Sequence, residues 1–297
     1  TTEPNTVTVH ITGSGSDGDA RRYKEMHADW QAAAVHEHRY GLDTPSHTFF
    51  AMKVFDKTGT FVAVKGLHMQ DPIHNHKKGD RSMDGRRTIT VGEFIATMND
   101  LEFVFEGFES FDQDLRKNDC AGRVADAMNW AACNRRCSMK TLECLRKIVE
   151  DRGVGQATLL VLQMWQRFIL IFFGKKVTLA DRVQSASFVT HCMRIMRIYV
   201  KAHPELNLSE HTFPRQTYTH ILLACQSIVL LMSAQRDFTP SVPFCGALTG
   251  SDICEIIFSI LTGSGQIKAG QRTFTAEQVK RDFNGVTAMK LMEHITF

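Results

Sequence analysis

The sequence predicts a small α/β segment at the N-terminus followed by a long all-α region, so that the fold is predominantly helical. Two observations support this expectation. Near the start of the chain, β-branched residues alternate with polar residues, which is the period of a strand. From about residue 91 onward, almost every segment has helical periodicity, and only short breaks separate one segment from the next.

The α/β segment combines strands with one helix. The Gly- and Ser-rich run at 13–19 is expected to end the first strand, and a helix over 19–34 follows with Asp19 as its N-cap. A turn-like Asp-Lys-Thr-Gly at 56–59 separates the other two strands. Strands are expected over 6–12, 48–55 and 60–68.

The rest of the chain is expected to be helical. Residues 158–173 form the most apolar segment, but Gln163, Gln166 and Arg167 interrupt it, which favours a buried helix over a membrane span. We see no signal peptide and expect no membrane partner. Helices are expected over 91–105, 123–134, 139–150, 157–173, 179–202, 215–235, 251–261 and 276–294.

Composition is typical of a globular protein. The 297 residues are 43% hydrophobic and 23% charged, enough apolar material for a sizeable core. The net charge of +3 does not by itself indicate a nucleic-acid partner. The eight cysteines form no CxxC pair, which favours reduced, packed thiols over a zinc site.

The first candidate site is the Ser-Asp-Gly motif at 16–18, which follows the first strand. A carboxylate at the C-terminal end of a strand, beside glycines, can point into a site and bind a hard cation. Asp17 is therefore a candidate metal ligand. The alternative is a turn whose acid caps the next helix, a role that suits Asp19 better than Asp17.

The second candidate site is the run Gln-Asp-Pro-Ile-His-Asn-His-Lys-Lys at 70–78, which follows a later strand. Its carboxylate, imidazoles and ammonium groups could hold a metal ion, orient a water molecule or contact phosphate. The alternative is an Asp-Pro turn with solvated side chains. A metal-dependent hydrolase is the least favoured use, because no distant motif completes the site. The residues concerned are Asp71, His74, His76, Lys77 and Lys78.

The third candidate is Glu255, which lies among isoleucines one turn into the expected helix 251–261. A carboxylate in apolar surroundings is costly unless it is exposed or paired. The functional interpretation is an acid directed into a site, and the alternative is a glutamate on the polar edge of the helix.

The order of these motifs resembles that of the P-element-like transposases, a family often fused to THAP zinc fingers. In that family a strand ends in a Ser-Asp-Gly-type motif, as at 16–18, and a later strand leads into Asp-Pro-x-His-x-x-Lys, as at 71–77. Residues 251–258 are similar to the family's Ser-x-x-Cys-Glu-x-x-Phe, which carries the catalytic glutamate. Fainter similarity extends through 126–130 and 180–199.

The resemblance implies an RNase H-like fold with a DDE-type site, in which two Asp and one Glu bind divalent ions, Mg²⁺ or Mn²⁺, for DNA strand cleavage and transfer. Asp17 and Glu255 are the implied metal ligands. His74, Lys77 and Lys78 would brace the site or contact phosphate. The implied partner is double-stranded DNA, both transposon ends and target, bound in the nucleus by a homo-oligomer.

Two assignments of the aspartates remain open. We favour Asp17 as the second acid of the triad, with the first expected upstream of residue 1 and Asp71 in a bracing role, because too few strands for a full RNase H sheet are visible between residues 6 and 71. In that case the chain is a fragment that lacks the first catalytic acid. The rival assignment makes Asp17 the first acid and Asp71 the second.

The resemblance also implies a domain order and leaves one alternative function. The family usually has Arg-containing residues where 259–263 read Ser-Ile-Leu-Thr-Gly, and an Arg-Asn pair where 79–81 read Gly-Asp-Arg. These departures leave open a domesticated, catalytically inactive scaffold that binds DNA or proteins. The expected segments are a partial RNase H-like α/β core at 1–90, a helical insertion at 91–243, the returning catalytic helix at 244–263 and a C-terminal helical segment at 264–297.

Overall fold

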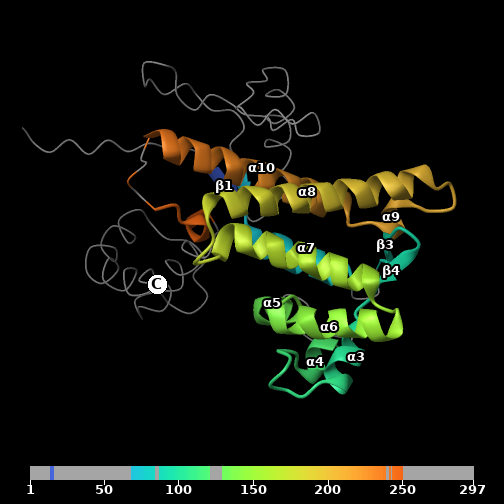
Figure 1. Ribbon diagram of the computed structural model, residues 1–297. Coiled ribbons are helices and arrows are strands. Elements are labelled where there is room, and N and C mark those ends of the chain that lie inside the picture. Colours follow the sequence, from blue (N-terminus) through green and yellow to red (C-terminus); the bar gives the residue numbers. More distant parts are fainter. Residues whose placement is uncertain are drawn as a thin grey trace, which may run out of the picture. The chain divides into compact units, whose positions relative to one another are not determined.

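The computed structural model describes residues 14–16, 68–83, 87–120, 129–238, 241 and 243–249. The chain divides into two compact units, 1–249 and 250–297, and every described residue belongs to the first. This part is predominantly helical, as the sequence predicts (Figure 1). Its strands are β1 (Ser14–Ser16), β2 (His68–Gln70), β3 (Ile89–Val91) and β4 (Phe94–Ala96).

Nine α-helices and a short 3-10 helix account for most of the described residues. The shorter ones are α2 (Pro72–Arg81), α3 (Asp100–Gly107), α4 (Lys117–Cys120), α5 (Trp130–Arg136), α9 (Leu208–His211) and the 3-10 helix η1 (Gly246–Thr249). The longer ones are α6 (Met139–Arg152), α7 (Gln156–Phe173), α8 (Leu179–Ala202) and α10 (Arg215–Phe238).

The long helices agree with the sequence prediction, and two of them, α6 and α8, carry recognisable caps. Ser138 accepts a hydrogen bond from the backbone of Thr141 at the start of α6, and Gly153 ends that helix in the left-handed conformation. Thr178 and Asp181 form a capping box at the start of α8. By contrast, α2, α4 and α9 are not among the predicted helices.

The helix expected over 91–105 is wrong in its first half. β3 and β4 pair antiparallel as a hairpin, and α3 begins only at Asp100. Gly92, in the two-residue turn between the strands, has φ +60, a conformation that a two-residue hairpin favours and that glycine adopts without strain. In the sequence, the apolar residues of the hairpin and of α3 together have the spacing of one continuous helix, which is why the sequence predicts a helix here.

The first strand also differs from the prediction. β1 lies inside the Gly- and Ser-rich run at 13–19 that was expected to end a strand, whereas 6–12 lies outside the described residues. Glycine and serine have low intrinsic strand propensity, so pairing with β2 must override the local preference.

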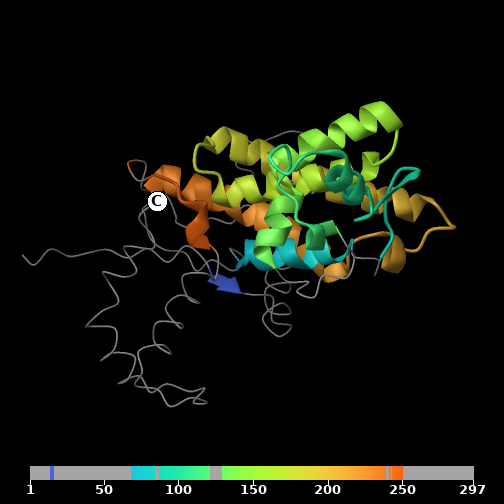
Figure 2. The same ribbon diagram turned by 90° about the horizontal axis from the view of Figure 1, so that it is seen from below.

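Helix α7 is the centre of the core. It packs against α2, α6, α8, α10, β4 and η1, and Figures 1 and 2 show it side by side with α8. Trp165, Phe168 and Phe172 on α7 are almost fully buried. Among the described helices, α7 alone has the length and apolarity of a membrane span, and half of it is buried inside the protein. Packing on several sides accounts for that apolarity, in line with the buried helix predicted from the sequence.

Candidate active site

The two parallel strands bring the two N-terminal motifs to one edge. The register of β1 and β2 pairs Ser16 with Gln70. Because parallel strands point in the same direction, the C-terminal ends of an in-register pair lie at the same edge of the sheet. In the sequence the next residue after each strand is an aspartate, Asp17 after β1 and Asp71 after β2. Asp17 lies outside the described residues, as does Glu255.

Asp71 is the N-cap of α2. Its carboxylate Oδ1 accepts a hydrogen bond of 3.1 Å from the backbone N–H of His74, and its backbone carbonyl accepts one of 3.0 Å from Asn75. Pro72 occupies the first turn of the helix, where its fixed φ is favourable and its missing N–H costs nothing. The motif therefore starts a helix, and the isolated turn considered from the sequence is wrong. Asp71 is only 4% exposed, and it lies between the end of β2 and the start of α2. Its carboxylate is therefore held in one position.

The histidines and lysines of the second motif differ in burial along helix α2. His76 is 1% exposed, and its ring lies 5.3 Å from that of Trp130 and 5.2 Å from that of Trp165, measured between centroids. Burial, assisted by the charge of Arg136, lowers the pKa of His76 to about 3. His76 is therefore a neutral core residue that cannot contact phosphate. His74, Lys77 and Lys78 are half-buried.

A buried ion pair ties α2 to the helical region. The carboxylate of Asp80 pairs with the guanidinium group of Arg136 on α5, and both side chains are almost fully buried. The thiol of Cys133, one turn before Arg136, donates to Asp80 Oδ2 at 3.3 Å. Burial raises the pKa of Asp80 and Arg136 opposes the rise, so the paired guanidinium is what keeps a charged carboxylate tolerable in the core.

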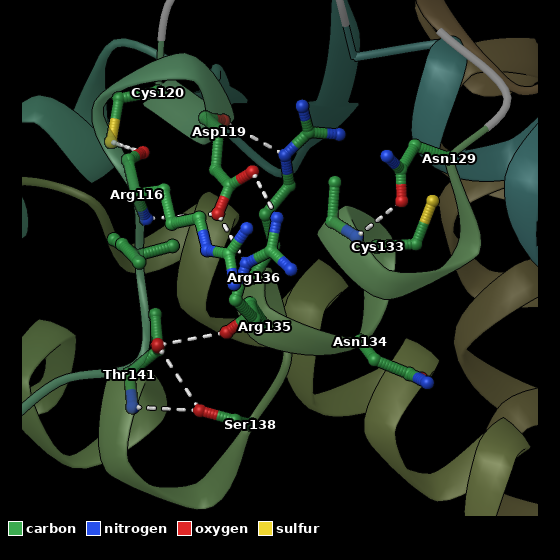
Figure 3. Close-up of polar contacts among 12 residues, drawn as sticks. Arg116, Asp119, Cys120, Asn129, Cys133, Asn134, Arg135, Arg136, Ser138 and Thr141 are labelled. Carbon is green, nitrogen blue, oxygen red and sulfur yellow. Dashed lines mark hydrogen bonds and ion pairs between the residues drawn. The ribbon is translucent and has the colours of Figure 1, made fainter. Parts of the chain in front are cut away.

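A second carboxylate, that of Asp119, also binds helix α5 (Figure 3). Asp119 accepts hydrogen bonds of 2.7 and 2.8 Å from Nε and Nη2 of Arg135, a bidentate geometry, and one of 2.9 Å from the backbone N–H of Arg116. The backbone carbonyl of Asp119 accepts from Nε of Arg136 at 2.8 Å. The adjacent arginines of α5 thus bind two aspartates, Asp80 on α2 and Asp119 on α4.

This network is not among the features predicted from the sequence. A signal was present, because Arg135 and Arg136 lie between two cysteines, Cys133 and Cys137, and charged side chains in a buried segment need partners. The identity of those partners is not readable from the chain, since Asp80 lies 56 residues before Arg136.

The described side chains do not form a metal site by themselves. Within the described ranges, no three His, Cys, Asp or Glu side chains are grouped so that they could hold a metal ion. Burial raises the pKa of the Cys133 and Cys137 thiols, so they remain protonated and are poor ligands.

The helical region packs directly on the strand that leads to Asp71. Helix α10 contacts both β2 and α2. His220 on α10 is fully buried, and burial together with the charge of Lys78 lowers its pKa to about 4. The end of β2 is therefore positioned by a helix that lies about 150 residues later in the chain, and small displacements of α10 would be transmitted to the strand edge.

No family model matches the chain, and no curated protein matches it. Among solved structures, the chain is similar to a chain of the Drosophila P element transposase strand transfer complex, with a TM-score of 0.53 and 14% sequence identity. The similarity covers 75% of this chain and 52% of that one, so this chain spans about half the length of the solved chain. At this identity the similarity shows a shared fold over the matched part.

Proposed function

We propose that this chain forms most of the catalytic core of a DNA transposase, which cleaves and joins DNA strands by phosphoryl transfer. The observation that carries the proposal is the register of β1 and β2, which end together, each with an aspartate next in sequence. Carboxylates gathered at a strand edge are what metal-assisted phosphoryl transfer requires. The fold shared with the P element strand transfer complex and the order of the sequence motifs support the same interpretation.

Asp17 and Glu255 are the proposed ligands of a divalent ion, Mg²⁺ or Mn²⁺, because carboxylate oxygens suit these hard cations. When bound, such an ion would supply positive charge that activates an attacking oxygen and stabilises the phosphoryl group. For Asp71 we propose a positioning role, since its carboxylate already caps α2 and is held by the backbone of His74. This is the bracing role that the favoured assignment of the triad expects.

The proposed partner is double-stranded DNA, bound as transposon ends and target by a homo-oligomer in the nucleus. His74, Lys77 and Lys78 are the described residues proposed to contact phosphate, because they are half-buried on the helix that starts at the strand edge. His76 is excluded from this role by its burial.

Metal binding and strand cleavage test the proposal separately. Titration calorimetry with Mn²⁺ is expected to show binding that Asp17→Asn and Glu255→Gln each weaken, whereas the control Glu143→Gln on the exposed face of α6 leaves it unchanged. Nicking of a supercoiled plasmid in Mn²⁺ is then measured on the 297-residue chain and on a longer chain that adds whatever residues the gene encodes before Thr1, where the proposal places the first acid.

The outcomes are distinct. Nicking by the longer chain that is lost in Asp17→Asn and Glu255→Gln supports the transposase proposal. Salt-sensitive DNA binding with no metal binding and no nicking in either chain would refute catalysis and favour a DNA-binding scaffold. Absence of DNA binding as well would refute the proposal entirely.

A further inference from the structure

Helix α8 exposes large apolar side chains on the side that faces away from the core. Ile195 is 62% exposed, Ile198 is 64% exposed and Phe188 is 36% exposed. These residues follow one another at intervals of seven and three, so they lie on one face of the helix. Isolated exposed apolar residues are ordinary, but several large ones on one face of a helix are typical of an interaction surface.

The row belongs to a regular pattern. The buried residues of α8 that share one seam recur at alternating intervals of four and three, the spacing of a coiled-coil contact. A second seam with the same alternation begins two residues later, and two residues turn a helix by about 200°, so the second seam lies opposite the first. The buried seam is Arg182, Ala186, Val189, Met193, Met196 and Val200. The outward seam is Gln184, Phe188, His191, Ile195, Ile198 and Ala202.

The charges beside the outward seam indicate what kind of helix would pair with it. Arg194 and Lys201 lie seven residues apart along one margin of the seam. No aspartate or glutamate occurs between Arg182 and His203, so no acidic side chain in this stretch of α8 offsets these two cations. The other two cations are engaged elsewhere: Arg182 donates to carbonyls at the end of α7, and Arg197 stacks on the ring of Tyr218 at 4.8 Å.

We propose that the outward seam of α8 docks an acidic amphipathic helix of a partner protein. Apolar side chains of that helix would pack on Phe188, Ile195 and Ile198, and carboxylates spaced seven residues apart would pair with Arg194 and Lys201. A second copy of this chain fits less well. Antiparallel pairing of two seams would oppose the basic margins, and parallel pairing would leave them opposite Cys192 and Tyr199.

The probe is a synthetic helical peptide of three heptads, with Leu at the apolar positions and Glu at the flanking positions, and the matched peptide carries Lys in place of Glu. Binding to the 297-residue chain is measured by fluorescence anisotropy. The Glu peptide is expected to bind more tightly than the Lys peptide. The double variant Ile195→Ser, Ile198→Ser is expected to weaken binding at least about tenfold because two buried contacts are lost.

Two further variants isolate the seam and its charge. Arg194→Glu with Lys201→Glu is expected to reverse the preference, so that the Lys peptide binds more tightly. Phe94→Ser with Ile95→Ser removes equally exposed apolar residues, 50% and 54% exposed, from the β3–β4 hairpin and is expected to leave binding unchanged. Circular dichroism melts confirm that each variant is folded.

Three results would overturn the proposal. One is equal binding, or no binding, of the two peptides. Another is a concentration-dependent dimer in sedimentation that disappears in the Ile195→Ser, Ile198→Ser variant, which would assign the seam to a second copy of the chain. The last is binding to phosphatidylserine vesicles that depends on the same isoleucines without any peptide preference, which would assign it to a lipid surface. The proposal does not depend on strand cleavage, so a failure of the transposase proposal leaves it standing.

Discussion

Arg136 on α5 and Asp80 on α2 form an ion pair in which both side chains are almost completely buried. The pair joins α2, which Asp71 caps, to the helical region, and Cys133 and the backbone of Asp119 contribute further hydrogen bonds to it. A buried charge that loses its partner is far more costly than an exposed one. The contact therefore fixes α2, and with it the end of β2, against α5.

Replacing Arg136 with Met is expected to lower the free energy of unfolding by about 3–5 kcal/mol, because the carboxylate of Asp80 would remain buried without its cation. Urea denaturation followed by circular dichroism measures the loss. The matched control is Lys140→Met. Lys140 lies 3.9 Å from Asp114 in an exposed pair, and its loss is expected to cost less than about 1 kcal/mol. Equal effects of the two variants would contradict the role given to burial.

Stability is expected to fall as the pH is lowered from 6.5, because burial holds the pKa of His76 at about 3 and that of His220 at about 4, against 6.5 in the unfolded chain. The unfolded state binds protons first, so each histidine contributes stability above pH 6.5 that is lost as the pH falls toward its folded value. The slope from each is roughly 1.4 kcal/mol per pH unit below about pH 6. Denaturation midpoints of the wild type and His76→Gln between pH 7 and 4.5 test this prediction. A variant with an unchanged slope would show that His76 does not titrate in this way.

Gly79→Ala is expected to destabilise the protein, although alanine normally favours a helix. A Cβ at this position would clash with ring atoms of Trp165, which is completely buried on α7, so one of the two helices must move. Overpacking of this kind typically costs about 1–3 kcal/mol. Gly107→Ala in α3 is the control, since nothing lies within 4 Å of its added Cβ. The melting temperature of the Gly79→Ala variant is expected to fall, whereas that of the Gly107→Ala variant is expected to change little or to rise.

Arg182→Met is expected to lower the free energy of unfolding by about 2–4 kcal/mol. The buried side chain of Arg182 on α8 donates hydrogen bonds to carbonyls at the C-terminal end of α7, and the variant would lose them. The Arg182 guanidinium donates to three carbonyls at that end of α7, those of Leu170, at 3.1 Å, and of Ile171 and Gly174. Arg182→Lys should recover only part of the loss, since one ammonium cannot reproduce the forked geometry. Full recovery by lysine would show that charge alone is sufficient.

Two substitutions of Asp71 distinguish a capping role of its carboxylate from a metal-binding role. Asp71→Asn keeps an oxygen that accepts from the backbone of His74, so stability should change little, whereas Asp71→Ala should cost about 1 kcal/mol. If Asp71 only positions the strand edge, Mn²⁺ affinity in the asparagine variant should stay close to that of the wild type. A large loss of Mn²⁺ affinity without a loss of stability would favour the rival assignment, in which Asp71 is itself a catalytic acid.

Several elements were predictable because their information is local. α6, α7, α8 and α10 follow helical periodicity, and the N-caps of α6 and α8 lie within a few residues of the helix starts. The β3–β4 hairpin was not predictable in this way, since Gly92 and its neighbours read equally well as the first turn of a helix until the turn geometry is known. α2 was missed because its histidines and lysines suggested a solvated cluster, although Asp71 and Pro72 carry a helix start signal.

The sequence by itself determined the helical character of the protein, the limits of its long helices and the order of the acidic motifs, because propensity, periodicity and capping act over a few residues. Only the tertiary structure decided that β1 and β2 pair in register before Asp17 and Asp71, that His76 is buried between two tryptophans, and that Asp80 pairs with Arg136. Each of these contacts joins residues more than 50 positions apart. Their free energies depend on burial and on the identity of the partner, which the packing of helices establishes and no local pattern contains.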